Sequence, residues 1–177
     1  MLSQLPEQAD PRRLCEQGKR YQGSVALRNF PRLAPLLTSH EGEAAFTLEF
    51  DRDAERRLRI RGQVSAKLVL RCQRCLGDMS LSVDAHFQLS PVGGLQEAER
   101  LPDEYDPLLL EAPLLHPLDL VEDELILAIP PAPRHSEAQC LVDVASYRNE
   151  QAEAAQPDDA KENPFAVLAS LKNDNTE

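Results

Sequence analysis

Two long runs of alternating apolar and polar residues constrain the fold of this chain most strongly. Between residues 58 and 72 the even positions are apolar, apart from one glycine, and most of the odd positions are charged or polar. The same period of two returns over residues 79–89. Successive side chains of a strand point to opposite faces, so each run predicts a long strand with one buried face. The segment 73–78 between them is short enough for an antiparallel hairpin.

Shorter patterns predict the remaining elements. Further strands are expected over residues 22–28, over 46–51 and, interrupted by Pro113, over 107–115. Asp10 followed by Pro11 predicts the start of a short helix that ends before Gly18. A second short helix is expected to place Leu33, Leu36 and Leu37 on one face, and a third is expected over residues 120–129 with a capping box formed by Asp119 and Glu122.

Together these elements predict an α+β fold. The expected sheet is antiparallel and strongly twisted, with barrel-like closure as one option, and its centre is formed by residues 46–51, 57–72 and 79–89. A length of 177 residues and a hydrophobic fraction of 42% fit a single domain, which we expect to span residues 1–148. Residues 149–162 predict an acidic flexible linker, and residues 163–177 predict a short docking helix and tail.

Charge is distributed unevenly along the chain. The whole protein carries 30 acidic and 19 basic residues, a net charge of -11, which argues against a general nucleic-acid binder. Residues 1–95 hold 14 basic and 11 acidic residues, whereas residues 96–177 hold 5 and 19. The two halves are therefore expected to face different partners or each other. Because residues 1–10 contain no secretory signal and no apolar run reaches about 18 residues, we expect a cytoplasmic protein without a membrane partner.

The basic side chains of the first half gather on one predicted strand. From residue 56 to residue 75 the chain has seven bases and no acid. The candidate RNA-binding residues are Arg57, Arg59, Arg61, Lys67, Arg71 and Arg74. A row of cations spaced at twice the strand rise can meet a phosphate backbone, and the absence of Trp favours contacts to backbone and shape over base stacking. The alternative is a solvated row whose arginines pair with the acidic second half.

Four residues could form a zinc site. Cys72 and Cys75 have the two-residue spacing that lets both sulfurs reach one tetrahedral ion, and His135 with Cys140 provides a second pair. Plain burial of the thiols and dithiol redox chemistry remain as alternatives, although strands on both sides and the nearby Asp78 disfavour a reactive thiolate. No disulfide framework is expected in the cytoplasm, and Cys15 is interpreted as structural.

Motifs of known enzymes are missing from the sequence. We find no Ser-His-Asp set, no phosphate-binding glycine loop and no dinucleotide fingerprint. The acids of residues 122–124 could hold Mg²⁺, but at helical spacing they are expected to spread over the solvent side of their helix. We therefore expect no enzyme.

The order of motifs resembles one bacterial family over residues 20–172. The motifs are Cys72-Gln73-Arg74-Cys75, Leu101-Pro102-Asp103-Glu104-Tyr105, Val121-Glu122-Asp123-Glu124-Leu125-Ile126-Leu127-Ala128, then Pro130, Pro133, His135 and Cys140, and finally Asn163-Pro164-Phe165-Ala166-Val167-Leu168. This order is similar to that of the YceD family. The resemblance implies a role in the accumulation of large-subunit (23S) ribosomal RNA, by analogy with plastid relatives that act on precursor ribosomal RNA. It implies no catalytic residues.

Two functions remain open from the sequence. The first is a non-catalytic factor that binds precursor of the large ribosomal RNA through the basic strand and supports its processing or stability in ribosome biogenesis. The second is an acidic adaptor or assembly chaperone for a basic ribosomal protein or an RNA-processing enzyme. The candidate partner-binding residues of the adaptor are Glu122, Glu124, Phe165 and Leu168.

Overall fold

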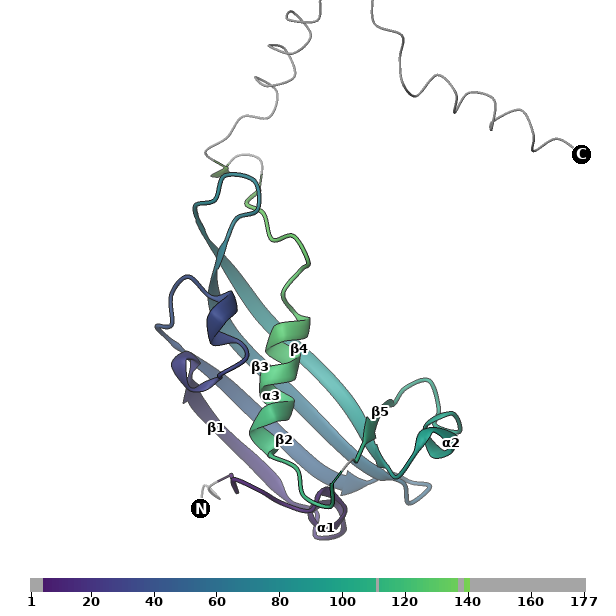
Figure 1. The fold of residues 1–177 in the computed structure, drawn as a ribbon. Coiled ribbons are helices and arrows are strands. Elements are labelled where there is room, and N and C mark those ends of the chain that lie inside the picture. Colours follow the sequence, from purple (N-terminus) through teal and green to yellow (C-terminus); the bar gives the residue numbers. More distant parts are fainter. Residues whose placement is uncertain (1–4, 111, 137–138, 141–177) are drawn as a thin grey trace, which may run out of the picture. The chain divides into compact units, whose positions relative to one another are not determined.

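The computed structural model describes residues 5–110, 112–136 and 139–140. It shows a five-stranded sheet in the order β1-β2-β3-β4-β5 with short helices, which confirms the α+β class (Figure 1). In chain order the elements are α1 (Pro11–Glu16), β1 (Arg20–Ala26), two 3-10 turns (Leu27–Asn29 and Ala34–Leu36), β2 (Glu43–Arg52), β3 (Leu58–Arg71), β4 (Asp78–Val92), α2 (Leu95–Ala98), β5 (Asp106–Leu109) and α3 (Pro117–Leu127).

The expected antiparallel arrangement of the central strands is confirmed, but β5 makes the sheet mixed, and the sheet is open, so the barrel-like option does not occur. Strands β1 to β4 form an antiparallel meander, and β3 and β4 make the predicted hairpin, in which Arg71 lies opposite Asp78. β5 runs parallel to the end of β4 and is only four residues long. Within the described residues β1 and β5 form the two opposite edges of the sheet and do not pair with each other.

Helix α3 covers the apolar face of the long strands. It packs against β3 and β4 with Leu120, Val121 and Leu125 buried (Figure 1). The even positions of β3 face this core and the odd positions face outward, as the period of two predicted. The one glycine in the apolar series, Gly62, lies opposite Phe87, and a Cβ atom there would come within 1.9 Å of the Phe87 ring. The aromatic ring takes the place of the missing side chain.

The predicted second helix is absent. Its residues form a single short 3-10 turn, Ala34–Leu36, flanked by the buried Leu33 and Leu37, whereas Leu36 is exposed. Pro35 explains the difference, since proline lacks the N–H that an α-helix needs in its interior. The first helix is confirmed, with the Asp10 carboxylate accepting hydrogen bonds from the backbone of Arg12 and Arg13.

Helix α3 begins earlier than the sequence predicted. Pro117 occupies its first turn and His116 precedes it, with no side-chain cap, so the expected capping box of Asp119 and Glu122 is wrong. Within this helix Glu122 lies on the buried side together with Leu120, Val121 and Leu125. Glu122 is buried, with 2% of its surface exposed, which contradicts the expectation that it faces solvent.

The described part of the chain lies within one compact unit, Met1–Cys140. The predicted linker at 149–162 and docking helix at 163–177, with Phe165 and Leu168, lie outside the described residues. Among the helices that the structure describes, none has the length and apolar character required to cross a bilayer.

Candidate metal centre and nucleic-acid interface

Four side chains from two distant segments meet at the end of the β3–β4 hairpin. Cys72 and Cys75 lie at the hairpin connection, and His135 and Cys140 lie in the segment that follows α3. The ligand atoms of all four lie within 4.8 Å of one another. In a tetrahedral zinc site with bonds of about 2.3 Å, sulfur ligands are about 3.8 Å apart. The predicted convergence is confirmed, and a small contraction would let the group bind a metal ion.

The backbone around the cluster holds both segments in place. The Gln73 N–H donates to the Pro133 carbonyl over 2.8 Å, and the Cys72 N–H donates to the Gly77 carbonyl over 2.9 Å. Leu76 closes the turn with a φ of 60°. These bonds bring the segment after α3 against the hairpin connection, so the cluster is assembled by tertiary contacts that the sequence spacing does not show.

The tautomer of His135 suits metal binding. Its Nε2 lies 2.9 Å from the Asp78 carbonyl oxygen, which can only accept, so Nε2 carries the proton. Its Nδ1 then presents a lone pair toward the cluster, 3.4 Å from the Cys75 Sγ. The Asp78 carbonyl bond raises the pKa of His135 more than burial lowers it. A carbonyl on the outer nitrogen is the usual support of a histidine that ligates a metal.

The thiolate of Cys72 is stabilised by its surroundings. Burial raises the pKa of Cys72, but backbone N–H groups, foremost those of Cys75, His135 and Arg74, outweigh this and lower it to about 5. Two of these groups lie 3.4 and 3.5 Å from the Cys72 sulfur. The expectation that Asp78 would disfavour a thiolate is therefore wrong, because backbone donors dominate. A preformed thiolate serves both a metal site and a dithiol, but a histidine and a third cysteine in the cluster favour metal.

Cys15 has a structural environment, as expected. It is buried at 2% exposure, and its thiol donates to the Arg59 carbonyl oxygen over 3.4 Å. Burial raises the pKa of Cys15 to about 11. We infer that Cys15 is a neutral, unreactive thiol that packs from α1 against β3.

The basic row of β3 is neutralised at its beginning. Arg59 makes two bonds of 2.7 and 2.9 Å to the Asp51 carboxylate, and Arg61 contacts Asp51 and Glu49. These acids belong to β2 and lie across from the arginines, so the pairing is within the sheet and not with the acidic second half. Arg57 is paired similarly, with Asp53 at 2.6 Å.

The other end of the row differs. Lys67 and Arg71 are exposed, and Arg74 lies at the hairpin connection. No carboxylate of the described residues forms a salt bridge with any of these three side chains. The six predicted RNA-binding residues therefore fall into three that are paired and three that have no carboxylate partner among the described residues.

The two predicted acidic partner-binding residues of α3 have different environments. Glu122 accepts hydrogen bonds from the backbone of Arg32 and Leu33, over 2.7 and 3.0 Å, and from the Arg32 Nε over 3.0 Å. It thereby ties the loop after β1 to the helix. Glu124 is half-buried, and its pKa is raised by burial and by the nearby acids Asp106 and Asp123. Only Glu124 has a carboxylate that a partner could reach without disturbing the fold.

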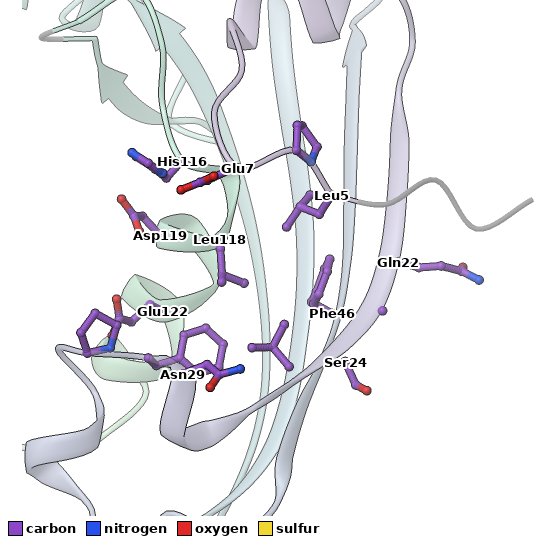
Figure 2. A pocket seen from close by; sticks show the side chains of 15 residues that line it. Leu5, Glu7, Gln22, Ser24, Asn29, Phe46, His116, Leu118, Asp119 and Glu122 are labelled. Atoms are coloured by element: carbon purple, nitrogen blue, oxygen red, sulfur yellow. The ribbon is translucent and has the colours of Figure 1, made fainter.

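An apolar groove of about 740 Å³ lies between β1 and α3. Figure 2 shows Phe46 and Leu118 facing it from opposite sides, with Leu5 above. Gly23 of β1 also lines it, and the absent side chain leaves space over the Phe46 ring, 3.4 Å from an ideal Cβ position. Glu7 and Asp119 add acidic groups to the lining. Sequence patterns did not reveal this groove, because its lining comes from segments far apart in the chain.

The fold and the cluster define the class: a small α+β domain whose hairpin end carries a Cys3His group able to bind a metal. The family model for the large ribosomal RNA subunit accumulation protein YceD matches residues 60–172, which contain all four members of the cluster. The Haemophilus influenzae protein "Large ribosomal RNA subunit accumulation protein YceD" is 34% identical over 171 residues, covering 95% of this chain and 96% of that protein. The chain therefore belongs to the YceD family. No solved structure matches it.

Proposed function

We propose that this protein is a non-catalytic cytoplasmic factor that binds precursor of the large-subunit ribosomal RNA and thereby supports its accumulation. The name of the family supports a role in the accumulation of large-subunit ribosomal RNA. The observation that carries direct RNA binding is the outward face of β3, where Lys67 and Arg71 are exposed and have no carboxylate partner among the described residues. Helix α3 covers the opposite face, so the described elements leave this face accessible to a nucleic acid.

The metal in this proposal is zinc with a structural role. Three thiols and an imidazole form the donor set that zinc prefers over magnesium or calcium, and four protein ligands leave no open position for a substrate. Bound zinc would cross-link the segment after α3 to the β3–β4 hairpin. The four ligands would therefore stabilise the fold and would not take part in a reaction.

The second candidate is a protein-binding adaptor, favoured by the groove between β1 and α3. Its apolar floor and the acids Glu7 and Asp119 suit a peptide with apolar and basic side chains. β1 is also an edge strand, able to pair with an extended segment. A basic ribosomal protein or an RNA-processing enzyme would provide such a peptide.

Affinity capture with and without RNase separates the two functions. RNA binding predicts that large-subunit precursor RNA is recovered and that RNase removes it. Purified protein should then bind structured RNA with an affinity that falls linearly with the logarithm of salt concentration. RNase-resistant recovery of a basic protein, with no RNA affinity at low salt where the electrostatic attraction is largest, would refute direct RNA binding and favour the adaptor.

A further inference from the structure

We propose that the metal-bearing end of the sheet, rather than the length of the basic strand, is the RNA-phosphate contact, and that metal binding sets its geometry. The contact consists of Arg71, Arg74 and Arg134, here called the basic tip. This inference rests on the proposed RNA-binding function and identifies the surface that performs it.

The arginines of the basic tip are placed by the metal ligands. Arg71 directly precedes Cys72, Arg74 directly precedes Cys75, and Arg134 directly precedes His135. A neighbour of a fixed ligand has little freedom in its backbone, so three cations from two segments are brought to one end of the domain. Arg134 was absent from the sequence prediction, because only the tertiary structure places it beside the hairpin.

Backbone contacts show that the two segments meet beside the arginines. The Gln73 N–H, one residue before Arg74, donates to the Pro133 carbonyl, one residue before Arg134, over 2.8 Å. The Arg74 N–H points to the Cys72 sulfur at 3.4 Å, so the backbone of this residue is itself part of the cluster.

The basic tip offers guanidinium groups that no described carboxylate occupies. Arg71 and Arg134 are exposed, Arg74 is half-buried, and none of the three forms a salt bridge with a described residue. Asp78 lies opposite Arg71 in the hairpin register but makes no ion pair with it. At Arg59, by contrast, a phosphate would first have to displace the two-bond contact with Asp51.

The chemistry of the tip fits phosphate better than bases or a protein surface. Guanidinium groups bind phosphate oxygens in pairs of parallel hydrogen bonds. Among the described residues the tip has no aromatic platform, since Tyr21 and Tyr105 are buried. Leu76 is the one exposed large apolar side chain of the hairpin connection, too little for the roughly 1,000 Å² of a stable protein interface. An A-form RNA backbone is therefore the fitting ligand.

The metal links the fold of the tip to binding. His135 and Cys140 bring Arg134 against the hairpin, and an ion joining them to Cys72 and Cys75 fixes the spacing of the three arginines. Removal of the ion should let the segment after α3 separate from the hairpin. RNA affinity is then expected to depend on metal although the metal touches no RNA.

The test is fluorescence anisotropy of the zinc-loaded full chain with a labelled RNA hairpin of about 16 base pairs. The triple variant Arg71→Gln/Arg74→Gln/Arg134→Gln should lose about tenfold or more in affinity, and the slope of log affinity against log salt should fall by about two units. The matched control Arg12→Gln/Arg13→Gln/Arg28→Gln removes the same charge at exposed positions away from the hairpin and should bind nearly as the wild type. The variant Arg59→Gln/Arg61→Gln should also retain its affinity.

Zinc content and thermal unfolding of each variant show whether the metal centre is intact. The version with three Arg→Lys changes at the tip keeps the charge but not the paired hydrogen bonds, so it should recover the salt dependence and part of the affinity, which separates phosphate binding from damage to the fold. Chelation of zinc should weaken wild-type binding to the level of the Gln triple variant. Two results would overturn the proposal without refuting RNA binding. One is an equal loss of RNA affinity in the tip and control variants, and the other is displacement of the labelled hairpin by polyglutamate as effectively as by unlabelled hairpin. A wild-type protein without RNA affinity would instead refute the proposed function.

Discussion

Replacing Glu122 should destabilise the domain strongly, because its carboxylate serves three donors inside the protein. In Glu122→Ala the backbone N–H of Leu33 loses its acceptor at a buried position, and Arg32 loses two charge-assisted hydrogen bonds. An unsatisfied buried donor costs about 1–3 kcal/mol, and a hydrogen bond to a charged group contributes about 1.5–3 kcal/mol. The Arg32 side chain is 51% exposed and can be rehydrated, which reduces the loss. We expect a total of about 4 kcal/mol.

Glu122→Gln should lie between the wild type and Glu122→Ala. Its remaining carbonyl oxygen can still accept from the backbone of Arg32 and Leu33, while the amide nitrogen faces the Arg32 Nε without accepting from it. The expected loss is about 2 kcal/mol, that of one charge-assisted bond.

Urea unfolding followed by circular dichroism measures these differences. Glu124→Ala is the matched control, two residues further on the same helix, and should cost under about 1 kcal/mol because burial and neighbouring acids already disfavour its charge. A loss of less than about 1 kcal/mol in Glu122→Ala, or a ranking in which Glu124→Ala is the less stable variant, would refute the reasoning. A large loss would mean that binding defects of Glu122 variants cannot be assigned to a partner.

Three further outcomes follow from the structure. Chelation of metal, or Cys140→Ser, should lower the thermal unfolding temperature in proportion to zinc released, as measured by calorimetry and a zinc-binding dye, whereas Cys15→Ser should leave zinc content unchanged. Gly62→Ala should cost about 1–3 kcal/mol by collision with the Phe87 ring, and Phe87→Leu should partly restore stability in a double-mutant cycle. Burial raises the pKa of Asp53, but hydrogen bonds from Tyr105 and Arg57 outweigh burial and hold this pKa below its usual value. The Asp53 carboxylate therefore stabilises the fold fully above about pH 4, and this stabilisation is lost as the pH falls through the lowered pKa. In acid titrations followed by fluorescence, Asp53→Asn should therefore be less stable at neutral pH and should show a shallower loss below pH 4.

Local patterns were sufficient for the secondary structure of the sheet. Alternation over β2, β3 and β4 fixes which side chains face the core, since the period of a strand is a property of the backbone. The helix α1 was equally readable, because Asp10 and Pro11 act within one turn. Pro35 lies inside the expected second helix, and its missing N–H is the reason that a short 3-10 turn forms there instead.

Residue types by themselves also pointed to the four candidate ligands that the structure brings together, since cysteine and histidine are the donors that zinc prefers. The sequence could not show that the two pairs meet, because residue spacing carries no information on contacts between segments 60 residues apart. The tertiary structure decided that, and it also decided which charges are available. Acids of β2 pair with Arg59 and Arg61 of β3, and α3 places Glu122 on its buried side. The segment after α3 packs against the hairpin connection and thereby places Arg134 beside it. The sequence determines which cations and acids the chain contains. Which of them pair depends on the distances between them, because electrostatic interactions weaken with distance, and only the folded structure sets those distances.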